Sequence, residues 1–462
     1  MSQPSRYPAE VADTPAANDA AALSGKLGKS FFGSRLVSIL HLFGGNIANS
    51  LLMLLGTALA ARTLGTEQFG VFVLVLTLGR FSERLVRFES WQPLIRFAAS
   101  EEQSFDSDRM GSLFLYGLLL DTASCLLAAA LTIGGGLLLM QTIGLQSEDL
   151  PLVMIFAAAI ALNIRGFPTA ALRLGGQFRT LAYLQTVSSF VRIVLAFGAF
   201  LMGLDVLAFI LIWTGVQIFD TALFLFISFR SLKRQGVANP LKAEWRNLPQ
   251  RFPGFMSFAW STNISSTLRT MTQEADTLLV GALGGASSAG FYHIAKRVAK
   301  VAMQIGANVQ AVMYPDMARL WAKLEIRAFR TVTSRLQLAL LAIGLAALVA
   351  TIFLGKPAIA LVLGSEFAEA YGLLIAQMVA VILILHAAPS RSALLSMGRP
   401  GVVLKVAALS TVLFFITAFV TMPIYGALGA NLAHIAFGLL TAVALDVVWW
   451  RESRKAMEGT AD

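Results

Sequence analysis

The sequence has few charged residues and a single cysteine. Only 13% of its 462 residues are Asp, Glu, Lys or Arg, whereas soluble domains contain about 25% charged residues. Hydrophobic residues make up 56% of the chain, which excludes an ordinary soluble enzyme. Cys125 stands alone, so a disulfide framework and a thiol metal cluster are both excluded. The four histidines lie far apart in the sequence and form no metal-ligand pattern.

Motifs for nucleic acids, nucleotides and catalysis are also missing. The net charge of +10 would suit a nucleic-acid partner, but such binding needs solvated basic surface, which most of this chain lacks. Gly28-Lys29-Ser30 imitates the end of a phosphate-binding loop, yet Leu23 occupies the position of its first glycine. No loop carries paired carboxylates, a nucleophile elbow or a dinucleotide turn. We therefore predict that the protein is not an enzyme, needs no cofactor or metal, and binds no nucleic acid.

Long apolar stretches fill the chain instead. A bilayer core about 30 Å thick needs about 20 mostly apolar residues per helix. Twelve stretches meet this requirement, and they predict an all-α integral membrane protein with 12 transmembrane helices. The predicted spans are residues 36–61, 68–88, 110–133, 151–172, 180–203, 206–229, 254–283, 288–314, 336–354, 367–390, 402–422 and 428–450.

The basic residues between the spans predict the orientation. Cytoplasmic loops carry the excess of Lys and Arg. Alternate loops and both terminal segments hold 26 basic residues, whereas the loops on the opposite side hold only Arg62 and Lys356. Both termini are therefore expected in the cytoplasm, which requires an even number of spans. Most of the net positive charge thus reflects the excess of Lys and Arg in the cytoplasmic segments.

Two halves of the chain share one plan. Leu64-Gly65 and Gly70 recur as Leu283-Gly284 and Gly290, at an offset of 219 to 220 residues. Ala171-Leu172 with Gly176 recurs as Ala393-Leu394 with Gly398, at an offset of 222. We predict two parallel six-helix lobes around a central cavity. The expected segments are a disordered cytoplasmic tail (1–35), an N-lobe (36–229), a cytoplasmic linker (230–253), a C-lobe (254–450) and a C-terminal tail (451–462).

Eight basic residues remain when the 26 on the cytoplasmic side and the two on the opposite side are set aside, and we place these eight within the membrane. A charge at the bilayer centre costs about 2.5–3.5 kcal/mol on insertion scales, so eight would cost on the order of 20 kcal/mol without water or partners. These eight side chains must therefore line a water-filled cavity or form ion pairs. The eight are Arg80, Arg165, Arg192, Arg269, Lys296, Arg297, Lys300 and Arg391.

Three of these cations define the main candidate site. Lys296, Arg297 and Lys300 lie within five residues and have no acid on the same turn, which favours a solvated surface for an anionic ligand. At an offset of 220 residues, Arg80 coincides with Lys300. The other reading is structural, with salt bridges, snorkelling and helix packing in place of ligand binding. The full candidate set for an anionic substrate is Lys296, Arg297, Lys300, Arg80, Arg269 and Arg192.

Acidic residues within the spans are candidates for ion coupling. Asp276, Glu274 and Asp121 stand among apolar residues, where a carboxylate can carry a proton or a cation. For Asp276 a second interpretation is open, since it could simply pair with Arg269.

Short motifs in the seventh and eighth spans resemble a known family. Asp276–Gly281, followed by Gly290-Phe291-Tyr292 and Ala295, resembles the motif of polysaccharide-unit flippases in the multidrug/oligosaccharidyl-lipid/polysaccharide exporter superfamily. Ala61–Gly70 looks like the first loop of that family, and Leu363-Gly364 with Tyr371 like its tenth-helix entry. Phe291 is a small departure, because the pattern often runs straight from Gly to Tyr.

This resemblance implies a multi-pass protein of the bacterial inner membrane. Its substrate would be an undecaprenyl-diphosphate-linked oligosaccharide, which is moved to the periplasmic leaflet by alternating access for lipopolysaccharide, capsule or exopolysaccharide synthesis. A polysaccharide polymerase and a ligase would be partners, beside the phospholipid bilayer. Three alternatives remain: a multidrug exporter of the same superfamily, a membrane-embedded transferase, and a scaffold.

Overall fold

The computed structural model describes residues 17–88, 90–101, 106–270 and 272–458, and its ordered elements are helices throughout these ranges. The N-terminal half contains α1 (Ala17–Val86), α2 (Trp91–Glu101), α3 (Ser107–Leu139), α4 (Leu150–Ala161), α5 (Gly166–Leu174), α6 (Phe178–Leu201), α7 (Val206–Arg234) and α8 (Leu248–Arg251). The C-terminal half contains α9 (Phe255–Thr270), α10 (Thr272–Ala322), α11 (Ile326–Val362), α12 (Ala370–Ser396), α13 (Pro400–Tyr425) and α14 (Ala427–Glu458).

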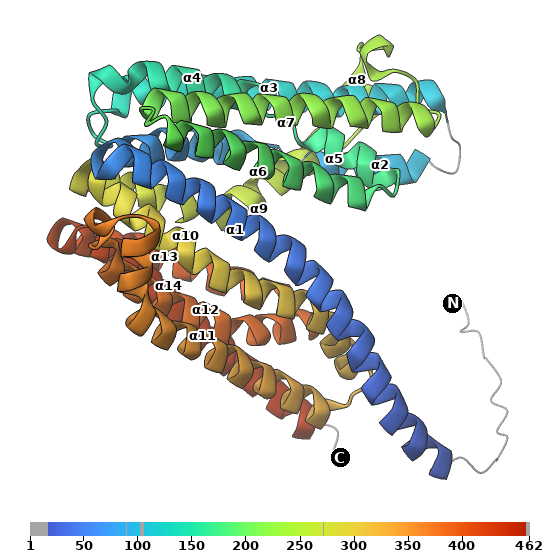
Figure 1. Cartoon of the computed structure of the whole chain (residues 1–462). Helices are drawn as coiled ribbons and strands as arrows, with labels where there is room; N and C mark the ends of the chain where they lie inside the picture. The colour runs from blue at the N-terminus through green and yellow to red at the C-terminus, as the bar shows by residue number, and fades with distance from the viewer. Residues whose placement is uncertain (1–16, 89, 102–105, 271, 459–462) are drawn as a thin grey trace.

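The helices form two bundles (Figure 1). The bundle of α2 to α7, drawn in blue to green, is the N-lobe, and the bundle of α10 to α14, drawn in yellow to red, is the C-lobe. Helix α1 packs on α3, α4, α6 and α7 of the N-lobe and also on α10 of the C-lobe. The bundles meet at one end and diverge toward the end that carries α8 and the C-terminus. This is the predicted architecture of an all-α protein with two lobes.

Two glycines break the longest helices where the lobes meet. Gly65 in α1 has φ 69° and ψ −179°, and Gly285 in α10 has φ 77° and ψ 179°. This backbone region is essentially restricted to glycine. One turn beyond the first break, a Cβ on Gly70 would lie 2.0 Å from the carbonyl oxygen of Ala286. The two broken helices therefore touch backbone to backbone.

Aromatic side chains seal the same contact. The Phe69 ring of the N-lobe and the Phe291 ring of the C-lobe both meet Phe367 edge to face, at centroid distances of 5.7 and 5.9 Å. All three rings belong to the largest hydrophobic core, which also contains Phe72 and Trp213. The main core of the molecule is thus shared between the lobes at this end.

Glycines with positive φ repeat along the chain and extend the evidence for a duplicated plan. Four such glycines in the N-terminal half have a counterpart in the other half at an offset of 220 to 223 residues. The pairs are Gly65 with Gly285, Gly144 with Gly364, Gly176 with Gly398, and Gly203 with Gly426. Each pair marks the same helix boundary in both lobes.

Nine helices of the described chain are long and apolar enough to cross a membrane. The twelve predicted spans are consistent with this set, because α1 and α10 each comprise two helical segments. Large apolar side chains face outward, among them Leu138 (83% exposed) and Phe353 (75% exposed). Such a surface suits lipid and would be costly in water.

The structure differs from the sequence expectations in three places. Helix α1 begins at Ala17, within the tail predicted to be disordered, because this stretch is rich in alanine, the strongest helix former. The predicted loop after residue 61 reduces to the break at Gly65. The predicted span 151–172 is interrupted between α4 and α5, where Asn163 and Arg165 take part in side-chain contacts.

Candidate functional site

A cluster of basic side chains joins the two lobes. Arg80 lies on α1, Arg192 on α6, and Arg297 and Lys300 on α10. The charge of Arg80 acts on Arg192, on Arg297 and on Lys300, and Arg192 also acts on Arg297. Four of the six predicted substrate-binding residues therefore lie close together. We call Arg80, Arg192, Arg297 and Lys300 the cationic cluster.

A small cavity lies within this cluster. Its wall includes Arg192 and Arg297, together with Gly56 and Trp213. The guanidinium carbon of Arg192 lies 5.5 Å from the centroid of the Trp213 ring, a cation–π distance. The cavity of about 10 Å³ has room for about one water molecule. Any larger ligand at Arg192 and Arg297 would have to widen this cavity.

The cationic cluster is poorly compensated. Glu274 is the acid whose charge acts on Arg297 and Lys300, and Asp220 acts on Arg192, whereas the other neighbouring charges that act on these three residues are positive. The buried Nε atoms of Arg192 and Arg297 have no hydrogen-bond partner in the described part of the chain. A buried guanidinium donor without an acceptor is unfavourable. The arrangement is suited to an anion that supplies the missing acceptors.

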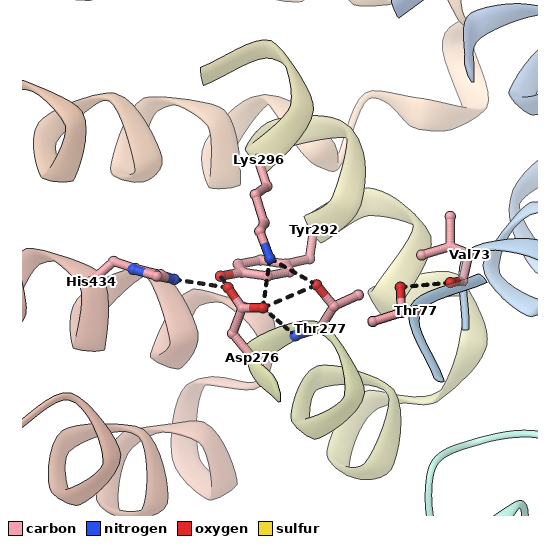
Figure 2. A network of polar contacts seen from close by, with 7 residues as sticks. All are labelled: Val73, Thr77, Asp276, Thr277, Tyr292, Lys296 and His434. Atoms are coloured by element: carbon pink, nitrogen blue, oxygen red, sulfur yellow. Dashed lines mark hydrogen bonds and ion pairs between the residues drawn. The ribbon is translucent and has the colours of Figure 1, made fainter. Parts of the chain in front are cut away.

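A second polar network surrounds Asp276 in the C-lobe (Figure 2). The Asp276 carboxylate is completely buried. Lys296 donates to its Oδ1 at 2.7 Å, while Tyr292 donates to Oδ2 and His434 Nε2 contacts Oδ2, both at 2.8 Å. The Thr277 backbone N–H also donates to Oδ1, at 2.6 Å. Both carboxylate oxygens are thus saturated by groups from α10 and α14.

The network changes the interpretation of Lys296. From the sequence, Lys296 has no acid on its own turn and belongs to a solvated ligand surface. In the structure it pairs with Asp276, which precedes it by 20 residues on the other side of the Gly285 break. Spacing along one helix does not reveal such a partner, because the break folds the chain back on itself. The backbone at Arg269 is part of α9, but its side chain is not among those described.

The Asp121 carboxylate accepts a backbone hydrogen bond at the start of α5. The Phe167 backbone N–H donates to its Oδ2 at 2.6 Å, and the neighbouring Gly166 backbone also acts on this carboxylate. These backbone donors belong to the first turn of α5, whose N–H groups have no partner within the helix. Asp121 on α3 therefore caps α5 from a neighbouring helix, and its role in ion coupling stays a prediction.

Several polar contacts were not anticipated from the sequence. In the N-lobe, Asn163 donates to Glu83 at 2.6 Å, Arg165 donates to Asn163 at 2.8 Å, and Arg165 also pairs with Asp220. In the C-lobe, His386 and His434 each pair with an aspartate. The histidines looked isolated because their partners are 60 and 158 residues away. No group of metal-binding residues is present in the searched part of the chain.

Comparison with known proteins identifies relatives of the sequence. A family model described as a polysaccharide biosynthesis protein matches residues 59–372. The inner membrane protein YghQ of Escherichia coli is 25% identical over 335 residues, which cover 71% of this chain and 92% of that protein.

Solved structures with the same fold are membrane transport proteins. The lipid II flippase MurJ in an inward closed conformation matches with a TM-score of 0.71 and 14% identity, over 90% of each chain. A multidrug resistance MATE family transporter in an inward-facing conformation matches with a TM-score of 0.67 and 14% identity, over 89% of this chain and 96% of that one. These matches confirm the predicted fold of a multi-pass membrane transporter, and these relatives are transporters and flippases rather than enzymes.

Proposed function

Because the chain belongs to the polysaccharide biosynthesis protein family, we propose that it is a flippase for a lipid-diphosphate-linked oligosaccharide. The substrate crosses from the cytoplasmic to the periplasmic leaflet of a bacterial inner membrane. The observation that carries this proposal is the cationic cluster, which takes basic side chains from both lobes and leaves the Nε atoms of Arg192 and Arg297 without an acceptor among the described residues.

The chemistry of a diphosphate matches these side chains. A diphosphate cannot cross hydrocarbon without replacements for its water of hydration. Arg80, Arg192 and Arg297 present planar guanidinium donors that grip phosphate oxygens two at a time, and Lys300 adds a point charge. The lipid tail remains between the lobes and in the bilayer while the head group occupies the cluster. The relative YghQ is an inner membrane protein of Escherichia coli, which supports the same location for this chain.

Transport follows from an exchange between two arrangements of the lobes. The contact of Gly70 with Ala286 closes one end of the molecule, and the bundles diverge at the other end. We infer that the diverging end faces the cytoplasm, as the basic loops predict, and that it admits the substrate. Release requires that the opposite arrangement binds the diphosphate more weakly.

The Asp276 network couples the substrate to the conformation of the C-lobe. Lys296 is one turn from Lys300, and its ammonium group can pair either with the Asp276 carboxylate or with an incoming phosphate. When Lys296 turns to phosphate, His434 and Tyr292 still hold Asp276.

With no nucleotide motif in the sequence, the energy comes from an ion gradient, the membrane potential or consumption of the product. Glu274 faces the cationic cluster and repels the departing phosphate.

A transport assay with charge-altered variants tests this function. Purified protein is reconstituted in vesicles with a labelled polyprenyl-diphosphate oligosaccharide, and its exposure in the outer leaflet is followed. We expect Arg297→Gln and Lys300→Gln each to lower the rate about 10-fold or more, since a hydrogen bond to a charged group contributes about 1.5–3 kcal/mol. Arg297→Lys keeps the charge and recovers part of the rate.

The matched control is Arg399→Gln, which removes an exposed ion pair with Glu452 at the lobe surface. It leaves the rate unchanged. Normal rates in both cluster variants, at equal protein amounts, would refute the proposal. Movement of organic cations in place of the lipid-linked sugar would instead favour a multidrug exporter. A polymerase and a ligase that consume the product are proposed as partners on the far side of the membrane.

A further inference from the structure

Each lobe contains a bridge between a basic side chain and an aspartate at related positions. In the N-lobe, Arg165 at the start of α5 pairs with Asp220 on α7. In the C-lobe, His386 on α12 pairs with Asp446 on α14, with Nε2 and Oδ2 2.9 Å apart. Arg165 and His386 are separated by 221 residues, within the repeat offset, and the two aspartates by 226, about one helical turn more. The duplicated fold thus uses the same type of bridge twice.

The C-lobe bridge is embedded in hydrogen bonds. Gln337 on α11 donates to Asp446 Oδ1 at 2.8 Å and to the Ser390 hydroxyl at 2.8 Å, and Ser390 also donates to Asp446 Oδ1. Asp446 therefore has acceptor sites filled by α11 and α12 in addition to His386. The side chains of His386 and Asp446 are 28% and 30% exposed, so water can reach the pair.

The two bridges differ in whether their base can lose its charge. Arg165 is always protonated in a protein. His386 is an imidazole, the side chain whose charge normally changes between pH 5 and 8. Because the Asp446 carboxylate only accepts hydrogen bonds, Nε2 of His386 keeps its hydrogen in both charge states. The exchangeable proton therefore binds at Nδ1.

Nδ1 of His386 is not engaged in a hydrogen bond to any described residue that would block this exchange. It is buried and has no hydrogen-bond partner in the described part of the molecule. Asp446 is the charged group found to act on the His386 ring, and the neighbouring element α11 contributes the neutral Gln337.

We propose that His386 and Asp446 form a proton-binding site in the C-lobe, which takes up one proton at Nδ1 of His386. Uptake converts a hydrogen bond between α12 and α14 into an ion pair. After release, hydrogen bonds from Gln337 and Ser390 stabilise the negative charge of Asp446. The site thus changes the net charge inside the C-lobe, while its N-lobe counterpart stays fixed. The further claim that this proton provides energy for flipping rests on the proposed function.

The proton site is tested first without any substrate. Ring signals of isotope-labelled histidine are recorded by NMR on the purified full-length protein between pH 5 and 8, and His386→Gln or His386→Arg assigns the signal. We expect this ring to titrate by one proton, and Asp446→Asn to move its midpoint. Thr441→Val on the same helix, which removes a hydrogen bond to Ser410, leaves the midpoint in place. A ring that keeps one protonation state over this range overturns the proposal.

Coupling is tested by the pH dependence of transport in vesicles. The native protein and Thr441→Val should share one pH profile between pH 6 and 8, and His386→Arg should flatten it at least threefold because its charge is permanent. An unchanged profile in His386→Arg overturns the coupling. If the native protein moves no lipid-linked sugar, the proposed function fails, while the NMR titration still decides whether the proton site exists.

Discussion

At the scale of single residues, the buried charges are organised by partners that lie far apart in the sequence. Asp276 and Lys296 are 20 residues apart, and His434 joins them from 158 residues away. Removal of Asp276 takes the shared acceptor from Lys296, Tyr292 and His434, which costs more than the ion pair itself contributes. The network is thus a site where single and paired substitutions give different results.

We expect Asp276→Asn to destabilise the protein by about 3–5 kcal/mol, because Lys296 then stays buried without its counter-ion. Thermal unfolding in detergent measures the loss. The double variant Asp276→Asn/Lys296→Met should recover part of it. If the two substitutions are additive instead, the pair is not coupled. Arg399→Gln serves as control, since exposed pairs contribute about 0–1 kcal/mol.

At the scale of helices, breaks and caps decide where polar groups can enter the apolar bundles. Gly65 and Gly285 allow α1 and α10 to turn without a loop, and the interruption between α4 and α5 exposes backbone donors to Asp121. These irregular points recur near the polar networks of both lobes. Helices in a membrane tolerate such breaks only where other groups satisfy the freed backbone.

Gly285→Ala isolates the cost of the break in α10. A Cβ at Gly285 meets no atom within 4 Å, so the penalty is backbone strain alone, about 1–3 kcal/mol. A lower melting temperature is expected. Gly134→Ala in α3, where a Cβ also meets nothing within 4 Å, is the matched control and should be neutral or slightly stabilising. Equal melting temperatures for both variants would show that Gly285 needs no special backbone.

At the scale of the whole molecule, the lobes share a core at one end and the cationic cluster further along. Phe69, Phe291 and Phe367 close the shared core around the contact of Gly70 with Ala286. A transporter that exchanges between two arrangements has to separate this contact. The free energy of the contacts between the lobes at this end therefore sets the fraction of molecules in the other arrangement.

Gly70→Ala probes the closed end directly. Its Cβ would lie 2.0 Å from the Ala286 oxygen, a backbone atom that cannot rotate away, so the lobes must shift apart. We expect a destabilisation of about 1–3 kcal/mol and greater solvent access to this end, measured by thermal unfolding and by labelling of an engineered cysteine at Ala286. Gly372→Ala in α12, with nothing within 4 Å, should change neither. Labelling that matches the native level would contradict the packing.

Orientation in the membrane is tested by reporter fusions. Fusions after Gln141 and after Gly236 should report opposite sides of the membrane, with Gly236 in the cytoplasm. This follows from the basic residues of the segment after α7, which include Arg230, Lys233 and Arg234. Activity of the same reporter at both positions would contradict the predicted topology.

The sequence by itself determined the class of this protein. Apolar length, the distribution of Lys and Arg and the recurring glycines predict a two-lobed helical membrane protein, since each is a property of local chain composition. They also single out six basic residues, because charges are rare in apolar spans: Arg80, Arg192, Arg269, Lys296, Arg297 and Lys300. Only the tertiary structure showed that four of them cluster and assigned partners to the buried aspartates. It placed Asp276 against Lys296 and His434, and His386 against Asp446, because ion pairs between helices depend on how broken helices cross rather than on spacing along one of them.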